Sequence, residues 1–535
     1  MKPDSKVTGL RYWMLRVLQE CENVAAHFTA DPVHDLRISL RRCRSMADGM
    51  MAMDPDRNWR AMKKAGKQLF QRLGALRDVQ IMMEWIEKLD LAKVSSSSSS
   101  GEAAATEEQN NSTSTSVVAQ PIPDPAQALL RILQARESEE KREARAALEA
   151  FDRKQWRHWS NSLPRRAARI RPGSAVFKHL ALERWMAARE LHRVAMRNRS
   201  QVAFHTLRIG IKRFRYIVEN FLPEEHEAWA NDLKHMQDLL GEVHDLDVLW
   251  ATAQSFHIFS DDVARQAWHE RIVRERTKRI EEYRQRTTGA NSLWKVWRAG
   301  LPQGKQVQDI ATRRMKLWAK ALDPDFAHSE RVARLSLQLY DGLAATSAFG
   351  KIAQNGGGNS DRRSLFAAAL LHDVGKSEGK KGHHKQSQEL IQKHGTPLGW
   401  NEEDTRRAAL VARFHCGALP GRRHKAMRDL LPDEQKSVIR LSAVLRLANA
   451  LDFAHDGHIR RVKVEPSSGT HKNERANGFL RTLPLAAENE ALVIAAEGYA
   501  DGTPTAQTVA AERYLLETVL RRPVIVRPLR AGTIH

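Results

Sequence analysis

The chain has 535 residues and a formal net charge of +22, from 86 Lys and Arg against 64 Asp and Glu. Hydrophobic residues make up 42 % of it, which is enough for several buried cores and excludes general disorder. No apolar run reaches the roughly 20 residues of a membrane span, and charges interrupt the N-terminal segment, so we expect a cytoplasmic protein without an export signal. Three scattered cysteines exclude a disulfide framework and a zinc site built from cysteines.

The positive charge is concentrated in particular segments of the sequence. Residues 1–94 and 127–300 together carry a net charge of +15, whereas residues 462–535 contribute +1. Residues 95–126 are acidic and rich in Ser, Asn and Pro, and this composition predicts a disordered insertion inside a domain. A second loop is predicted at 354–360. Its glycine triplet lacks the spacing of a phosphate-binding loop, so we interpret it as a linker.

A pattern of one histidine and four bases occurs twice in the first 300 residues. In each copy the bases follow the histidine at +3, +7, +8 and +10, and apolar residues stand at +2, +6 and +9. At about 100° per residue, positions 0, +3, +7 and +10 of a helix fall within an arc of about 80°, opposite the apolar positions. Each copy therefore predicts a helix with one buried and one cationic face, here called a histidine helix. The residues are His34, Arg37, Arg41, Arg42 and Arg44 in the first copy and His205, Arg208, Lys212, Arg213 and Arg215 in the second.

A second motif follows each histidine helix. Residues 73–79 and 240–246 both begin with Leu-Gly and carry an Asp four residues after the glycine; we call them the Leu-Gly motifs. The recurrence of the whole unit predicts two related helical bundles packed together. Basic helix faces are usually only solvated, but aligned guanidinium groups repel one another, and a row of phosphates would neutralise them. Aromatic residues are not interleaved with the bases, which disfavours stacking on single-stranded nucleic acid.

This region resembles the CHAD domain, a conserved-histidine α-helical domain built from a pair of four-helix bundles related by pseudo-symmetry. The resemblance spans residues 8–285 and rests on the two histidine helices and the two Leu-Gly motifs. It implies that the region binds inorganic polyphosphate in a basic channel lined by the two histidine helices. The binding residues that it implies are the histidines and bases of both copies, together with Tyr216 at the channel edge.

From residue 328 onward the histidines stand in a different setting. His328 opens a predicted amphipathic helix, and the pair His372–Asp373 ends a strongly apolar one, with Gly375 as the expected C-cap. A lone buried histidine is usually a hydrogen-bonded core residue, whereas an adjacent His-Asp pair flanked by a distant His and Asp favours a metal site. Imidazoles and carboxylates together suit a divalent ion that keeps positions open for water and phosphate oxygens.

This pattern is similar to that of the HD superfamily of metal-dependent phosphohydrolases. More narrowly, residues 310–530 resemble the C-terminal portion of the exopolyphosphatase/guanosine pentaphosphatase family. The resemblance implies one divalent metal ion, such as Mg, Mn or Fe, with the ligands His328, His372, Asp373 and Asp452. It also implies Asp373 and Lys376 as catalytic residues, and contacts to the substrate phosphate from His384, Arg413 and His415.

The sequence departs from this family at two motifs. Gln386 replaces the last histidine of a His-His-Lys-His-Ser run, which weakens the case for a second metal ion. Cys416 and Gly417 replace two bases of an Arg-x-His-Arg-Lys run, which weakens contacts to phosphate. The motifs of the actin-like ATPase-fold module, which performs polyphosphate hydrolysis in that family, do not occur. Ordinary exopolyphosphatase chemistry is therefore not assumed.

The sequence as a whole predicts a mainly α protein. Two pseudo-symmetric helical bundles are expected at 8–285, an all-helical HD-type domain at 310–460, and a small α+β domain at 461–535. In the last of these, strands are expected at 461–465, 479–485, 491–496 and 524–526, and a helix at 506–520.

Three functions stay open on this reading of the sequence. The first is a polyphosphate-binding protein whose HD-type domain hydrolyses polyphosphate or a phosphorylated nucleotide, such as a guanosine polyphosphate. The second is a non-enzymatic polyphosphate-binding or granule-targeting protein with a vestigial HD module. The third, nonspecific nucleic-acid binding, is disfavoured by the repeat and predicts comparable affinity for RNA and polyphosphate. Polyphosphate binding is the prediction that the first two share. No membrane partner is expected, and a homodimer stays open.

Overall fold

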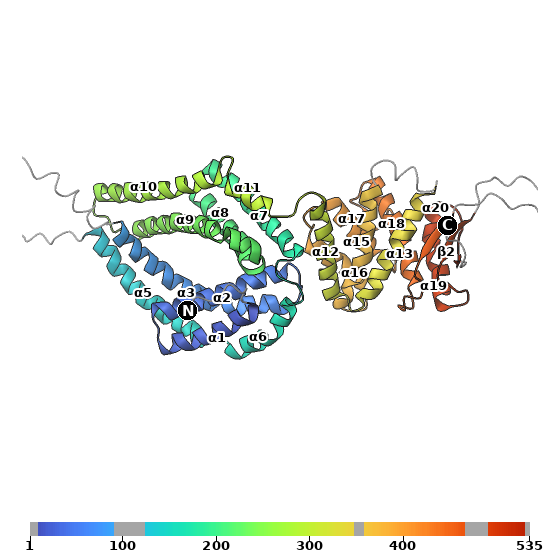
Figure 1. Cartoon of the computed structure of the whole chain (residues 1–535), viewed down its shortest axis with the longest axis horizontal. Helices are drawn as coiled ribbons and strands as arrows, with labels where there is room; N and C mark the ends of the chain where they lie inside the picture. The colour runs from blue at the N-terminus through green and yellow to red at the C-terminus, as the bar shows by residue number, and fades with distance from the viewer. Residues whose placement is uncertain (1–8, 90–123, 347–357, 466–490, 530–535) are drawn as a thin grey trace, which may run out of the picture. The chain divides into compact units, whose positions relative to one another are not determined.

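The computed structural model describes residues 9–89, 124–346, 358–465 and 491–529 of the chain. The chain divides into two compact units, Met1–Gln303 and Gly304–His535. Helices dominate both units, and a small sheet belongs to the second (Figure 1). The predicted fold class, mainly α with a small α+β tail, is therefore confirmed.

The first unit consists of two helical bundles (Figure 1). The first bundle contains α1 (Leu10–Ala26), α2 (Ala30–Met51), α3 (Arg57–Lys88), α5 (Pro125–Glu149) and α6 (Arg153–Ala167). The second contains α7 (Ala175–Asn198), α8 (Gln201–Phe221), α9 (Pro223–Ser255), α10 (Asp262–Thr287) and α11 (Leu293–Ala299). The two histidine helices are α2 and α8, and the Leu-Gly motifs lie in α3 and α9, so both copies of the repeat form the same helix pair.

Side-chain caps and buried rings hold these helices in place. Asp56, Asp124 and Ser200 each accept a hydrogen bond from the backbone at the start of α3, α5 and α8. The fully buried indole of Trp156 donates to the carbonyl oxygen of Met14 at 3.0 Å, which ties α6 to α1. Local capping thus sets where the helices begin, and buried aromatic contacts set how they pack.

The two bundles are joined by a shared core and by a polar link between the histidine helices. Asn220 of α8 donates to Ser45 Oγ of α2 at 2.8 Å and accepts from Arg42 at 3.2 Å. These bonds hold α2 and α8 against each other. The shared core lies where α3 meets α9 and α10 and contains Val79, Met82, Trp85, Ile86, Leu246, Leu249, Trp268 and Ile272.

The second unit begins with helices. They are α12 (Lys305–Leu322), α13 (Phe326–Ala344), α15 (Gly358–Leu371), the 3-10 turn η2 (Val374–Ser377), α16 (His383–His394), α17 (Glu402–Arg413), the 3-10 turn η3 (Lys425–Met427) and α18 (Pro432–Leu451). The last helix, α18, is buried along most of its length and packs against α13, α15 and α17. Its apolar side chains lie at the centre of the hydrophobic core of this unit.

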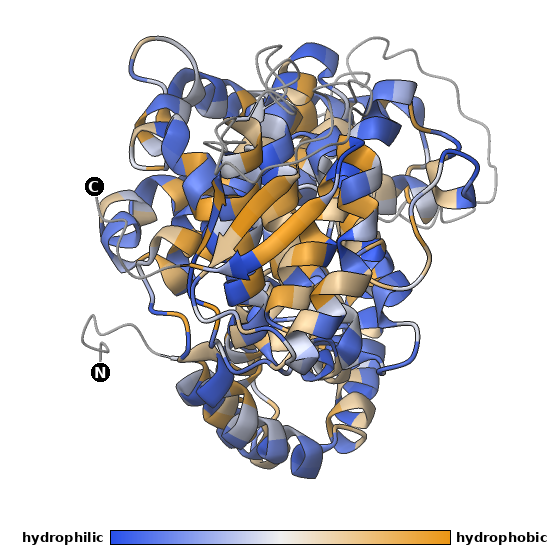
Figure 2. Ribbon diagram, turned by 90° about the vertical axis from the view of Figure 1, so that its right-hand side faces the viewer, coloured by the Kyte–Doolittle hydropathy of each residue, from blue (hydrophilic) through white to orange (hydrophobic). Residues whose placement is uncertain are grey.

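The chain ends in a three-stranded sheet. Its strands, in the order β1 (Val462–Glu465), β2 (Leu492–Ala496), β3 (Val524–Pro528), pair antiparallel and then parallel. Because parallel neighbours need a crossover, α19 (Pro504–Glu512) and α20 (Tyr514–Leu520) connect β2 to β3. The strands are largely hydrophobic (Figure 2), and the central Ile494 is fully buried.

The structure differs in detail from the expected elements. The helix expected at 506–520 is two helices that meet at Arg513. The backbone N–H of Arg513 donates to the carbonyl oxygen of Val509, and its carbonyl oxygen accepts from the backbone N–H of Glu517. Pro125, at the end of the predicted insertion, already begins α5 because Asp124 caps that helix. Gly358, in the predicted linker, begins α15. The strand expected at 479–485 lies outside the described residues.

Gly375 has a different role from the expected C-cap. It lies in η2 and has no positive φ, so it forms no left-handed cap at the end of α15. A β-carbon on it would come within 2.1 Å of the His383 carbonyl oxygen and 2.6 Å of the Ser387 nitrogen. Ser387 Oγ accepts from Gly375 N at 2.9 Å and donates to the His372 carbonyl oxygen at 2.6 Å. Glycine is therefore required for the close packing of η2 on α16.

Candidate functional site

The two histidine helices bring four of the predicted bases into one cluster. These are Arg37 and Arg41 of α2 and Arg208 and Lys212 of α8, here called the central cations. Burial, followed by the charges of the three arginines, lowers the pKa of Lys212 to about 8, so the four groups influence one another across the two bundles. The Nε atoms of the three arginines are buried and have no hydrogen-bond partner among the described residues. Since buried polar groups normally have partners, these three Nε atoms lack an acceptor.

Tyr216, which the resemblance places at the channel edge, lies beside Arg41 of the central cations. The Arg41 guanidinium is 5.8 Å from the centre of its ring. Its hydroxyl is buried and has no hydrogen-bond partner among the described residues. Burial raises the pKa of Tyr216 above its usual value, so the hydroxyl keeps its proton and can donate to an anion.

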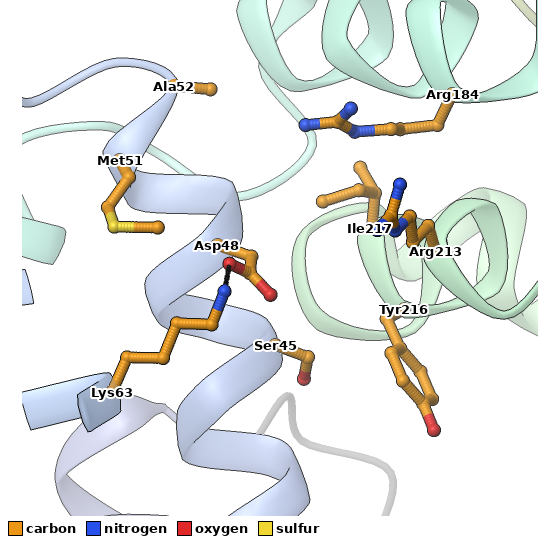
Figure 3. A pocket seen from close by; sticks show the side chains of 9 residues that line it. All are labelled: Ser45, Asp48, Met51, Ala52, Lys63, Arg184, Arg213, Tyr216 and Ile217. Atoms are coloured by element: carbon orange, nitrogen blue, oxygen red, sulfur yellow. Dashed lines mark hydrogen bonds and ion pairs between the residues drawn. The ribbon is translucent and has the colours of Figure 1, made fainter. Parts of the chain in front are cut away.

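A pocket of about 390 Å³ lies beside Tyr216 (Figure 3). Lys63 of α3, Arg184 of α7 and the exposed Arg213 of α8 contribute cationic side chains to its walls. Asp48 forms an ion pair with Lys63 (Figure 3), whereas no described carboxylate pairs with either arginine. The pocket therefore continues the cationic character of the neighbouring cluster.

Acidic residues from the Leu-Gly motifs border the central cations. Burial raises the pKa of Asp245 to about 6, against the lowering influence of Arg208, and the nearby charge of Asp78 raises it further. The two motif acids thus face each other and the cations. An added β-carbon on Gly241 would lie 4.0 Å from Arg208 Nε, an ordinary contact distance, and one on Gly74 would meet no atom within 4 Å, so close packing requires neither glycine.

The histidines of the two histidine helices lie in different surroundings. His205 is half-buried, and its Nδ1 is 3.3 Å from Nδ1 of His244 on α9. Burial and neighbouring cations lower the pKa of His244 to about 4, so this ring is neutral. His34 is exposed, and Arg77 takes the place of His244 in its copy. We did not predict a role for His244; its place next to Asp245 in the second Leu-Gly motif was the available signal.

The remaining predicted bases contact the protein itself. Arg42 forms an ion pair with Glu219, and Arg215 Nη2 lies 3.9 Å from the same carboxylate. Arg44 donates to the carbonyl oxygen of Lys63 on α3 at 3.2 Å. Arg42 and Arg44 thus link α2 to α8 and α3, whereas the contact of Arg215 with Glu219 stays within α8.

In the second unit, buried histidines and acids converge from three helices. His328 lies at the start of α13, His372 and Asp373 follow α15, and Asp452 follows α18. Ligand atoms of His328, His372 and Asp373 lie within 4.8 Å of one another, and Asp452 Oδ2 is 2.7 Å from His328 Nδ1. The structure thus brings together all four residues that were predicted to hold a metal ion.

Some of these ligand atoms are occupied and others are not. Arg331 Nε contacts both oxygens of Asp452, at 3.0 and 2.9 Å, and Asp452 also contacts His328. By contrast, His372 Nε2 and Asp373 Oδ1 are buried and form no hydrogen bond of good geometry with the described residues, although His383 Nε2 lies 3.2 Å from Asp373 Oδ1. Orphaned imidazole and carboxylate atoms in one cluster are what a divalent cation would satisfy, so the residues fit such an ion.

Asp373 is the negative centre of this cluster. Burial opposes its charge, but His372 and His383 hold the pKa of Asp373 well below its usual range. The ammonium group of Lys376 donates to Asp373 Oδ2, so the predicted catalytic pair is in direct contact. Burial lowers the pKa of His415 well below its usual value, so this neighbouring ring is neutral.

The three residues predicted to contact the substrate phosphate lie in different places. His415 is buried, with its Nε2 3.8 Å from Asp373 Oδ1, so it belongs to the same cluster. Arg413 is half-buried and donates to a glutamine of α16 at 2.8 Å, and His384 is half-buried. His383, to which we had assigned no role, is 3.2 Å from Asp373 Oδ1. The adjacent histidine pair at 383–384 was the only feature of the sequence that could have pointed to His383.

Family comparisons identify both parts of the chain. Residues 14–254 match the CHAD domain, and residues 310–489 match the Ppx/GppA phosphatase, domain III. The chain therefore carries a CHAD domain followed by an exopolyphosphatase-like C-terminal region, which confirms the family resemblance drawn from the motifs. A search of curated proteins found no match. Among the helices that the structure describes, none has the length and apolar character of a membrane span.

Proposed function

We propose that the chain binds inorganic polyphosphate between α2 and α8. The observation that carries this proposal is the cluster of central cations, in which both repeats supply bases and three buried Nε atoms lack acceptors. Polyphosphate offers a regular row of anionic oxygens, which guanidinium groups bind in bidentate fashion. Both matched families are polyphosphate-related, which supports the same ligand. Such a protein would associate with polyphosphate granules.

Nucleic acid fits this face less well. Its bases need aromatic rings on which to stack, and the ring of Tyr216 is already contacted by Arg41. The motif acids Asp78 and Asp245 also border the cations and leave a narrow positive row. A slender polyanion without bases suits this arrangement better than a nucleic-acid strand.

A double charge reversal, Arg37→Glu with Arg208→Glu, tests the proposal. Because charge-assisted hydrogen bonds contribute about 1.5–3 kcal/mol each, we expect polyphosphate affinity to fall by at least about a hundredfold in a titration. The matched control is Arg157→Glu with Arg193→Glu, which changes the net charge equally at two exposed positions and should leave affinity within about threefold. Equal losses in both variants, or equal affinity of the parent chain for RNA, would refute the proposal.

A second candidate function is hydrolysis of a phosphate ester or anhydride in the second unit. The orphaned His372 Nε2 and Asp373 Oδ1 favour it. We propose that one divalent ion, such as Mg²⁺, Mn²⁺ or Fe²⁺, is held by His328, His372, Asp373 and Asp452. Such an ion, when bound, supplies Lewis acidity toward water and phosphate oxygens. Lys376, held by Asp373, would position a phosphate oxygen of polyphosphate or of a phosphorylated nucleotide.

Metal analysis and phosphate release test this second function. We expect the purified chain to bind a divalent ion and to release phosphate from polyphosphate or guanosine tetraphosphate, and His372→Ala to abolish both. His269→Ala, which removes an exposed histidine of α10 in the first unit, should change neither. Absence of bound metal, together with release that is unchanged in His372→Ala, would leave a non-enzymatic polyphosphate-binding protein.

A further inference from the structure

The tetrapeptide Asp-Phe-Ala-His occurs twice in the second unit, from Asp325 to His328 and from Asp452 to His455. The first copy lies at the start of α13, and the second follows the end of α18. Each copy supplies one member of the predicted metal set, which is the histidine of the first copy and the aspartate of the second. Asp325 and His455 have no role in the proposed function.

The two copies contact each other in a reciprocal way. His328 Nδ1 lies 2.7 Å from Asp452 Oδ2, and His455 Nδ1 lies 2.7 Å from Asp325 Oδ2. Each histidine therefore pairs with the aspartate of the other copy. The two imidazole rings stack face to face, with their centres 3.7 Å apart and their planes 8° from parallel. These contacts join the start of α13 to the segment that follows α18.

Backbone contacts hold His455 in this position. Arg331 Nη2 donates to the carbonyl oxygen of His455 at 2.8 Å, and Arg331 Nε contacts Asp452. The backbone N–H of His455 donates to the carbonyl oxygen of Asp452 at 3.0 Å. His455 has a φ of 57°, in the left-handed region that residues with a β-carbon rarely adopt. Such a conformation persists only where the surrounding contacts maintain it, so the fold fixes the place of this ring.

The two stacked histidines differ in exposure. His328 is 1 % exposed, whereas 38 % of the His455 side chain is exposed, so His455 covers one face of the buried ring. Asp452 and Asn449 contact the two ring nitrogens of His328, at 2.7 Å and 3.0 Å. Hydrogen bonds to ring nitrogens act in the plane of the ring. A ring held only at its two nitrogens can tilt about the line between them, and the stacked ring of His455 prevents this tilt.

We propose that His455 is a positioning residue for His328. Its ring holds the His328 imidazole where it approaches His372 and Asp373, with the centres of the two buried rings 5.4 Å apart. The inference rests on the metal site of the second proposed function. Residues outside the ligand set commonly orient metal-binding histidines, and their loss lowers metal affinity by about 10–100-fold. Asp325 supports this role because it accepts from the His455 ring and from the backbone N–H of His328.

Titration of the full chain with Mn²⁺ tests this role through two substitutions of one residue. His455→Ala removes the stacked ring, and we expect Mn²⁺ affinity to fall about 10–100-fold. His455→Phe keeps a flat ring but loses the contact with Asp325, so it should lose less than about threefold. The matched control is His458→Ala, which removes an exposed histidine of the same segment and should stay within about twofold of the parent. Equal losses in the Ala and Phe variants, or no loss in either, would refute the stacking role.

Modification by diethyl pyrocarbonate tests the same contact in the metal-free chain. The reagent acylates accessible imidazole nitrogens, and mass spectrometry of the peptides reports His328 separately from other histidines. We expect His328 to react at least about tenfold faster in His455→Ala than in the parent chain or in His455→Phe. Equal rates in all three chains would overturn the proposal. A parent chain that binds no Mn²⁺ but shows this difference in rates would refute the metal site and support the positioning of His328 by His455.

Discussion

The first unit collects charges on a face that remains partly open, whereas the second collects histidine rings and a carboxylate in a closed cluster. The central cations are half-buried, lie on long helices and come from two copies of one repeat. His372, Asp373 and His415 are almost completely buried and follow the ends of helices. A polymer needs a face that is accessible along its length, but an ion needs only a few converging atoms. The two units therefore differ in the kind of ligand that their geometry would suit.

The closed packing of the second unit predicts the largest effect. In Gly375→Ala, the added carbon would lie 2.1 Å from the His383 carbonyl oxygen, so η2 and α16 must separate. We expect the second unit to lose about 3 kcal/mol of unfolding free energy, measured by hydrogen exchange of its peptides in the full chain. Gly421→Ala, where an added carbon meets no atom within 4 Å, should change it by less than about 0.5 kcal/mol. Similar values for the two variants would contradict the packing argument.

The open face of the first unit predicts a smaller effect that differs between arginines of the same motif. Arg208→Ala removes a central cation, and we expect polyphosphate affinity to fall about tenfold in a titration. Arg44→Ala removes a base that donates to the backbone of α3 at 3.2 Å, so affinity should change less than about twofold. Equal losses would show that the whole cationic face binds, and that the contact of Arg44 with α3 is irrelevant to the ligand.

Two titratable groups near the central cations predict that polyphosphate affinity depends on pH. Burial raises the pKa of Asp245 to about 6, and burial with neighbouring cations lowers the pKa of Lys212 to about 8. As the pH falls, Lys212 gains its charge below about 8 and Asp245 loses its repelling charge below about 6. Affinity should therefore rise by roughly threefold or more from pH 8.5 to 5.5. Lys212 faces Arg208, Arg41, Arg37 and Asp78, and Asp245 faces Arg208, Asp78, Glu242 and Arg77.

Two variants separate these contributions to the pH dependence. Lys212→Arg keeps its charge at every pH used, so it should flatten the alkaline part of the affinity curve. Asp245→Asn is neutral throughout and should flatten the acidic part. Curves that keep the shape of the parent in both variants would assign the pH dependence to other groups.

The first unit was largely predictable because its signals are local and repeated. Helix periodicity identified α2 and α8, and the repeat indicated that they belong together. The role of each base was not predictable, since Arg37 and Arg44 share one arc of the helix. Arg44 donates to the Lys63 carbonyl oxygen only because α3 packs against α2, and the sequence does not show this packing. Residues that are distant in the sequence but adjacent in the fold determine which bases belong to the central cations.

In the second unit, the sequence predicted which histidines and acids converge, but not which other residues contact them. His328, His372, Asp373 and Asp452 converge as the sequence pattern predicted. Arg331, which occupies Asp452, carried no signal that distinguished it from other basic residues of α13. The sequence showed Cys416 only as the replacement of a base in the family's Arg-x-His-Arg-Lys run, and this gave no sign of its neighbours in the fold. Its approach to His383 depends on how α17 packs on α16, which no local pattern records.

The smallest predicted effect concerns Gly74, the glycine of the first Leu-Gly motif. A β-carbon on Gly74 would meet no atom within 4 Å inside the long helix α3. Since Ala favours a helix interior over Gly by about 0.8–1.0 kcal/mol, Gly74→Ala should stabilise the first unit by up to that amount in denaturant unfolding. Polyphosphate affinity should stay within about twofold of the parent. A tenfold loss of affinity would instead mean that the phosphate chain approaches α3 at Gly74, which would extend the binding face beyond α2 and α8.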